Sequence, residues 1–240
     1  EEKPVQPTPA LGTPQAPKIS SPTHPDSNIW YSNDDPLFSW NVPSGVTSVR
    51  LLYDKSTASS PSVLYGAISN KQLSDVGDGA YYFHAQFANA SGWGAIAHMR
   101  FQIDTTPPKP FAIQVVHESD SNDPRAIISF ETSDATSGID RYTVSVGDIA
   151  PVTVQPDEAA RGSYVLPVGK SGRQTIVVKA YDRAGNSTTE SLSLTIVALD
   201  PPTISEYSKQ VADGEFFTVS GTTYPNANVV ITIRDSSNNA

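Results

Sequence analysis

Residues 81–94 read YYFHAQFANASGWG, and this stretch decides the fold class. Positions 81, 83, 85 and 87 are aromatic or apolar, whereas positions 82, 84 and 86 are Tyr, His and Gln. Alternation with period two indicates a β-strand with one buried face and one solvent face. Turn signals precede it at Asp78-Gly79 and follow it at Ser91-Gly92. We therefore predict a strand over 81–89, with Tyr81, Phe83 and Phe87 in a core and His84 on the solvent face.

Short strand-like runs continue on both sides of this stretch. No long segment repeats apolar residues at i, i+3, i+4 and i+7, whereas 15 Gly and 20 Pro punctuate the chain. Both features favour an all-β protein. Within residues 18–106 the other predicted strands are Leu37–Trp40, Val49–Tyr53, Val63–Tyr65 and Ala95–Ile103. We place Trp40 in the same core as Tyr81.

Two proline pairs divide the chain. Pro107-Pro108 and Pro201-Pro202 lie 94 residues apart, which is the length of one immunoglobulin-sized domain. Proline fixes φ and lacks an N–H group, so neither pair fits inside a central strand, and both should form short, stiff linkers. The predicted organisation is a Pro-rich spacer over 1–17, sandwiches over 18–106 and 107–199, and the front part of a third, incomplete sandwich over 200–240.

The segment 107–199 contains the seven short strands that a simple sandwich needs. We expect Ile176 and Val178 in its core. The predicted strands are Phe111–Val116, Ala126–Glu131, Tyr142–Val146, Val152–Val154, Tyr164–Leu166, Thr175–Tyr181 and Leu192–Val197. In residues 200–240 they are Thr203–Ser205, Phe216–Ser220 and Val229–Ile233.

The first sandwich resembles a fibronectin type III-like domain. Ser39-Trp40 stands where that family has its second-strand Trp, and residues 81–94 resemble its penultimate strand and following loop. The opening from His24-Pro25-Asp26 to Trp40 looks like modules of large bacterial surface proteins. The resemblance implies that Tyr81 is the corner tyrosine, with a buried ring and a hydroxyl bonded to upstream backbone.

The second sandwich looks like a bacterial Ig-like domain. Residues 133–142 (SDATSGIDRY) and 180–186 (AYDRAGN) carry the resemblance. In the second phrase Asp182 can accept backbone N–H bonds within a tight turn. Residues 220–228 look like part of another such domain. These families are repeat units of adhesins, stalks and multi-domain secreted enzymes, so the resemblance implies an architecture without naming a ligand.

Composition excludes several classes of function. The chain has no cysteine, which rules out disulfides, thiolate metal sites and cysteine nucleophiles. Its net charge of −9, without a Lys/Arg cluster, disfavours nucleic acid as a partner. No apolar run approaches the roughly 18 residues of a membrane span, so we expect no membrane insertion within this segment.

The sequence also lacks the catalytic motifs that we searched for. The sequence has no G-x-S-x-G nucleophile elbow and no H-E-x-x-H metal motif, and its four histidines are scattered. Gly169-Lys170-Ser171 lacks the preceding Gly of a phosphate-binding loop, because Tyr164 occupies that position. We predict that the chain is not an enzyme and needs no cofactor, with calcium as the one candidate.

Acidic residues in predicted loops and at the domain junctions are the calcium candidates. Ca²⁺ takes six to eight oxygen ligands, so loops that converge at a junction could bind it. None of these residues matches the EF-hand loop, and the alternative is that they are solvated turn acids. The candidates are Asp104, Asp200, Asp120, Asp123 and Asp134.

Three aromatic residues are candidates for ligand binding. Trp93, between Gly92 and Gly94, is expected in a loop, where an exposed indole could stack on a sugar ring. The alternative is that Trp93 folds back over the edge of the sandwich. Trp30 and Tyr31 could form a similar surface or cap the first sandwich.

These observations favour a non-catalytic structural stalk or adhesion segment of a bacterial surface or secreted protein. We expect it to lie outside the cell as a monomeric segment of a longer chain, with a cell-surface protein or glycan as its partner. The alternative is a set of carbohydrate-binding accessory modules of a larger secreted enzyme. Three or more exposed aromatics on one face would favour that alternative.

Overall fold

The computed structural model describes residues 12–120, 123, 125–167, 170–198, 201–223 and 229–232. These residues form 15 strands and one four-residue helix, α1 (Pro156–Ala159). The prediction of an all-β protein built from tandem β-sandwiches is confirmed. Contacts group the residues into two units. The first contains 1–110, 132–142 and 179–189, and the second contains 111–131, 143–178 and 190–240.

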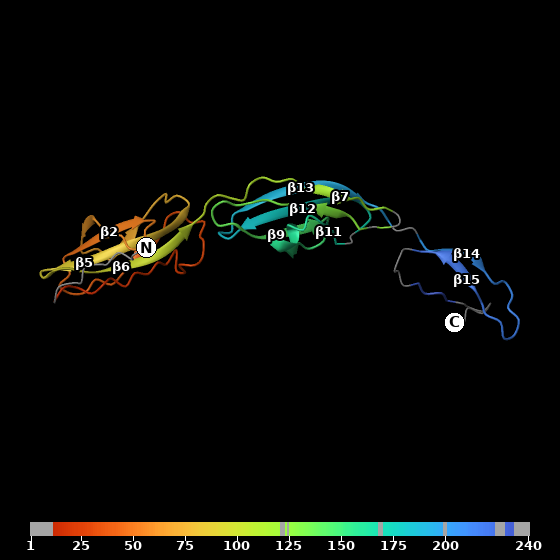
Figure 1. The fold of residues 1–240 in the computed structure, drawn as a ribbon, viewed down its shortest axis with the longest axis horizontal. Helices are drawn as coiled ribbons and strands as arrows, with labels where there is room; N and C mark the ends of the chain where they lie inside the picture. The colour runs from red at the N-terminus through yellow and green to blue at the C-terminus, as the bar shows by residue number, and fades with distance from the viewer. Residues whose placement is uncertain are drawn as a thin grey trace. The chain divides into compact units, whose positions relative to one another are not determined.

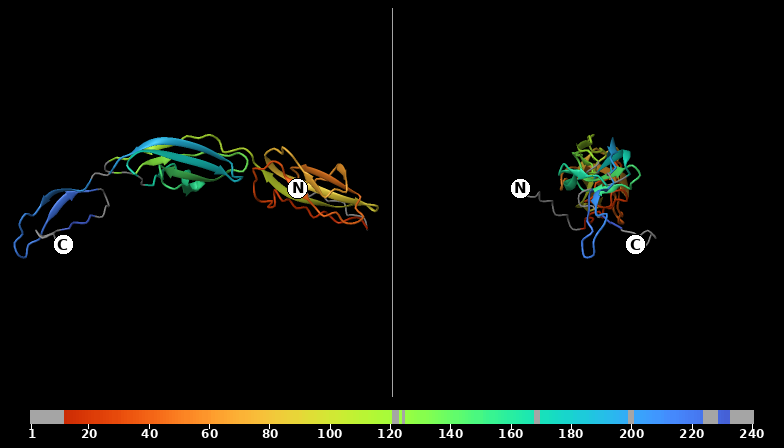
Figure 2. Two further views of the ribbon diagram at one scale, coloured as in Figure 1. Left: turned by 180° about the vertical axis from the view of Figure 1, so that it is seen from behind. Right: turned by 90° about the vertical axis from the view of Figure 1, so that its right-hand side faces the viewer.

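The first sandwich has a four-stranded antiparallel sheet in the order β3-β2-β5-β6. Its long hairpin, β5 and β6, is drawn in yellow tones in Figure 1 and seen from behind in Figure 2. The strands are β2 (Ser48–Asp54), β3 (Val63–Gly66), β5 (Gly79–Asn89) and β6 (Gly92–Ile103). The opposing layer pairs β1 (Leu37–Ser39) with β4 (Asn70–Gln72), and Ser20 bridges to Ser39 at its edge.

Aromatic rings fill the space between these two layers. Phe38 of β1 stacks on Phe83 of β5 with ring centroids 4.1 Å apart and meets Phe101 of β6 edge-on at 5.1 Å. Trp40 is 5% exposed, and its indole N–H donates to the Ile68 carbonyl at 2.8 Å. Tyr81 is only partly buried, and its hydroxyl donates a long 3.4 Å hydrogen bond to the Asp78 carbonyl.

The N-terminal segment 12–17, which we expected to be part of a spacer, lies against the first sandwich. The Asn89 side-chain amide donates to the Gly12 carbonyl at 2.9 Å, and Pro17 is buried. Pro14 approaches Gly94 so closely that a β-carbon at Gly94 would lie 1.9 Å from the Pro14 oxygen. Glycine at position 94 therefore permits this packing. Residues 1–11 of the predicted spacer lie outside the described residues.

The second sandwich repeats the strand order of the first. Its four-stranded sheet runs β10-β9-β12-β13, and its three-stranded sheet runs β11-β8-β7. The larger sheet contains the third, second, fifth and sixth strands of the first sandwich, and the fourth, third, sixth and seventh strands of the second. The offset of one arises because the second sandwich begins with an additional strand, β7, where the first has only the bridge from Ser20 to Ser39. The members are β7 (Gln114–His117), β8 (Ile127–Ser129), β9 (Ile139–Val146), β10 (Val152–Val154), β11 (Tyr164–Val165), β12 (Gly172–Asp182) and β13 (Ser187–Ile196). Ile176 and Val178 of β12 are fully buried.

The remaining described residues form an antiparallel pair, β14 (Thr203–Tyr207) with β15 (Val219–Thr222). Apolar side chains are exposed here, including Ile204 of β14 at 63% and Phe216, in the segment between the two strands, at 90%. The strand expected over Val229–Ile233 is not formed in residues 229–232, and Ile233 lies outside the described residues.

Candidate functional site

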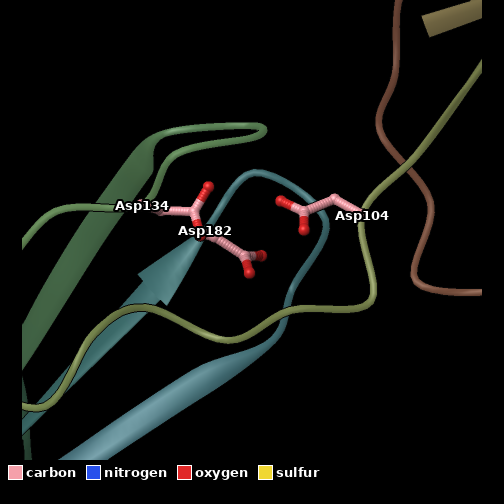
Figure 3. Close-up of side chains that lie close together, drawn as sticks. All are labelled: Asp104, Asp134 and Asp182. Carbon is pink, nitrogen blue, oxygen red and sulfur yellow. The ribbon is translucent and has the colours of Figure 1, made fainter. Parts of the chain in front are cut away.

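Three aspartates from distant parts of the sequence meet in the first unit. Asp104, Asp134 and Asp182 each offer a carboxylate oxygen, and these oxygens lie within 4.8 Å of one another. Figure 3 shows the three side chains converging from three separate segments. Asp104 is fully buried and Asp182 is 1% exposed. Among the described residues no other group of His, Cys, Asp and Glu comes together in this way.

Asp104 follows β6 directly and is fixed by backbone hydrogen bonds. Its N–H donates to the Tyr31 carbonyl at 2.9 Å. Its Oδ1 accepts the Thr106 N–H at 3.2 Å, and its Oδ2 accepts the Ser137 N–H at 3.0 Å. The second of these bonds joins the end of the first sandwich to the loop before β9.

Asp134 organises that loop around one carboxylate oxygen. Its Oδ1 accepts three successive backbone N–H groups, from Thr136 at 3.0 Å, Ser137 at 2.8 Å and Gly138 at 2.9 Å. Gly138 has a φ of 80°, which glycine adopts without strain. The loop therefore presents Asp134 at a fixed position.

Asp182 ends β12 in the tight turn that the sequence predicts. Its Oδ1 accepts the N–H groups of Ala184 and Asn186, both at 2.9 Å. Its Oδ2 accepts the Asn186 side-chain amide at 2.9 Å, and the same amide donates to the Asp104 carbonyl at 2.7 Å. Asn186 thus ties the turn to the backbone of Asp104.

The cluster concentrates negative charge where water is scarce. Burial raises the pKa of Asp104, and the neighbouring carboxylates Asp134 and Asp182 act in the same direction, whereas the nearby Ser137 hydroxyl and the Thr106 N–H oppose the rise. Within the described ranges, no Lys, Arg or His forms an ion pair with any of the three. The arrangement therefore suits a bound cation.

The remaining calcium candidates lie elsewhere. Asp123 holds Arg125 with bonds of 2.8 and 2.6 Å, and Asp120 accepts the Asp123 N–H at 2.7 Å, both in the second unit. Asp200 lies outside the described residues. Sequence reasoning missed Asp182 as a possible ligand, because its turn explains the residue locally. Only the three-dimensional structure shows that this turn reaches Asp104.

The three candidate aromatics do not gather into one surface. Trp93 lies in β6 rather than in the expected loop, and the Arg50 guanidinium sits 4.0 Å from its ring centroid. Tyr31 bridges to Ile103 at the other end of β6, and Trp30 is its half-buried neighbour. Ten residues of strand separate positions 93 and 103, a distance of about 33 Å. One sugar chain could not stack on both ends as a single compact site.

The expected solvent position of His84 is wrong, because the residue is fully buried. Its Nδ1 lies 2.5 Å from Nδ1 of His98 on β6, and its Nε2 lies 3.2 Å from Oδ1 of Asp54 on β2. Side chains from the two neighbouring strands thus cover it on the outer face of the sheet. His24 is also fully buried, between Thr23 and the Asn33 carbonyl.

No family model matches the chain, and no curated protein matches it. Two similar solved structures are the CbhA fibronectin(III)-like modules of Clostridium thermocellum and the FN1–FN3 domains of chicken CNTN1. The first is 17% identical with a TM-score of 0.41, over 74% of this chain and 93% of that one. The second is 15% identical with a TM-score of 0.38, over 78% of this chain and 68% of that one.

In the part of the chain that the structure describes, no helix is long and apolar enough to cross a membrane.

Proposed function

We propose that the chain is a non-catalytic structural segment, a stalk or adhesion region, of a bacterial cell-surface or secreted protein. The observation that supports this proposal is the repeated strand order of two successive sandwiches. Each sandwich buries its own apolar residues, such as Phe83 in the first and Ile176 in the second. Repetition of one folded unit adds length to a protein without adding a new site.

Two of the four histidines serve the fold. His24 and His84 are fully buried and hydrogen-bonded within the first sandwich. A general base needs access to a substrate proton, and neither imidazole reaches solvent. This burial favours a structural role for His24 and His84 over a catalytic one.

The carbohydrate-binding alternative needs aromatic rings gathered on one face. Trp93 packs under Arg50, and Tyr31 accepts the Asp26 N–H through its hydroxyl at 3.0 Å. The separation of these residues along β6 leaves the alternative without a common binding surface. Retention on insoluble polysaccharides that disappears in Trp93→Ala would nevertheless favour it over the stalk.

Single-molecule stretching of the full chain tests the structural role. A load-bearing segment should unfold in two separate events, one for residues 18–106 and one for 107–199. Each event should release about 300 Å of chain, because an extended residue spans at most about 3.6 Å. A single event, or extension without a resolved force peak, would contradict the proposal.

A further inference from the structure

The three-aspartate cluster is electrostatically incomplete as it stands. Isolated buried carboxylates are costly unless they are paired, and like charges raise that cost. Asp104 and Asp182 are almost wholly buried, and in the described residues no basic side chain pairs with them or with Asp134. The backbone N–H groups that they accept compensate part of the charge. A positive ion would compensate much of the rest.

A buried hydroxyl beside the cluster gives an independent indication of a ligand. Ser137 is 4% exposed, and its Oγ has no hydrogen-bond partner of normal geometry. The same hydroxyl lies beside the Asp104 carboxylate. A buried polar atom without a partner costs free energy, so its place beside three carboxylates calls for an explanation. An ion that accepts oxygen ligands would satisfy Ser137 and the carboxylates together.

From this geometry we propose that Asp104, Asp134 and Asp182 bind one calcium ion, with Ser137 Oγ available as a further oxygen ligand. The available donors are all oxygens, which suit hard cations rather than zinc or copper. Ca²⁺ accepts irregular arrangements of six to eight oxygens, whereas Mg²⁺ demands a near-octahedral set. Carboxylates held by three separate loops fit the less demanding ion.

The ion would join three segments of the first unit. These are the residues after β6, the loop 132–142 and the turn 182–186 that ends β12. They are already joined by the Ser137 N–H and the Asn186 side chain, both of which contact Asp104. The Arg183 N–H also donates to the Gly138 carbonyl, and the Lys109 N–H donates to the Ser133 carbonyl. Calcium would therefore stabilise the first unit whatever the chain binds elsewhere.

Thermal unfolding of the full chain tests this site through tryptophan fluorescence. All three tryptophans, Trp30, Trp40 and Trp93, belong to the first unit, so the signal reports on that unit. Calcium sites of extracellular modules have Kd values of about 0.1–1 mM. Transfer from EGTA to 10 mM CaCl₂ should raise Tm by about 5 °C or more. Equilibrium dialysis at the same calcium concentration should show one bound equivalent per chain.

Asp134→Asn is the sharpest variant, because an amide oxygen can still accept the three N–H groups that Oδ1 now accepts. In EGTA this variant should melt above the wild type, since one repelling charge is gone. It should bind calcium at least tenfold more weakly and lose the rise in Tm. Asp157→Asn, a side chain 80% exposed on α1, is the matched control and should respond like the wild type.

Three results would overturn the proposal. The first is an identical Tm in EGTA and in calcium. The second is an equal rise with MgCl₂ at matched ionic strength, which would indicate screening or a different ion. The third is an unchanged calcium response in Asp134→Asn. If that variant fails to fold, the dialysis of wild-type protein still decides, because less than one bound equivalent contradicts the site.

Discussion

Trp40 shows how one residue joins the two layers of the first sandwich. Its ring stacks near Phe83 at a centroid distance of 5.9 Å, and its N–H satisfies the Ile68 carbonyl. Trp40→Ala should lower the free energy of unfolding by about 3–5 kcal/mol through the cavity and the lost hydrogen bond. This loss is measured by urea unfolding, with circular dichroism as the signal. Trp40→Phe should cost less, and equal losses in the two variants would contradict this account of the ring.

Gly94 contributes to packing because it has no β-carbon. A β-carbon there would collide with the Pro14 backbone, so Gly94→Ala should displace the segment 12–17 while leaving the sandwich folded. The expected loss of stability is about 1–3 kcal/mol. Cleavage within 12–17 by a nonspecific protease should accelerate. Gly66→Ala in β3 is the control, because its β-carbon would meet open space, and equal acceleration there would refute the role of Gly94.

At the scale of elements, the outer face of the sheet formed by β2, β5 and β6 carries His98, whose protonation makes the stability of the fold depend on pH. Burial lowers the pKa of His98, and the neighbouring His84 lowers it further, whereas Asp54 acts in the opposite direction. Burial also lowers the pKa of His24, partly offset by the Asn33 carbonyl. Both histidines therefore bind protons more weakly when folded than when unfolded, where the pKa is about 6.5.

The sign of the effect follows from linkage. The unfolded chain binds more protons below pH 6.5, so stability is fully present above that pH and falls as the solution becomes more acidic. Urea midpoints from tryptophan fluorescence should be lower at pH 5.5 than at pH 7.5. His98→Gln should reduce this difference, whereas His117→Gln in exposed β7 should not. A larger midpoint at pH 5.5 would show that the sign is wrong.

Strands of this protein are predictable where alternation is strong. β5 and β10 lie where the sequence places them, with two extra residues at the start of β5. β4 was missed because Asn70–Gln72 is short, polar and without alternation. The burial of His84 could not be read from its own strand, since Asp54 and His98 on neighbouring strands cover it. The sequence predicts two members of the aspartate cluster, Asp104 and Asp134, because both stand in loops. It does not predict the third, because Asp182 comes close to them only through tertiary folding.

At the scale of the whole molecule, the segment after β6 connects successive repeats and is held by more than its prolines. Asp78 accepts hydrogen bonds from the Thr105 N–H at 2.8 Å and from the Thr105 and Thr106 hydroxyls at 2.9 and 2.5 Å. Further along, the Lys109 N–H donates to the Ser133 carbonyl at 3.1 Å. These two anchors add to the bonds that Ser137 and Asn186 make to Asp104 and to the fixed φ of Pro107 and Pro108.

Removing the first anchor should free only its own end of the segment. Burial alone would raise the pKa of Asp78, but hydrogen bonds from Thr106 and Thr105 outweigh it and lower the pKa, so the carboxylate is charged at neutral pH. Hydrogen bonds to charged groups contribute about 1.5–3 kcal/mol. In Asp78→Ala the Thr105 amide should therefore exchange its hydrogen about ten- to a hundredfold faster, as measured by NMR. The Lys109 amide should keep its protection, because its acceptor is untouched.

Asp157→Ala, on an exposed carboxylate, should change neither amide. Equal loss of protection at Thr105 and Lys109 would show that the segment opens as one piece, and that Asp78, rather than two anchors, controls the connection between the repeats.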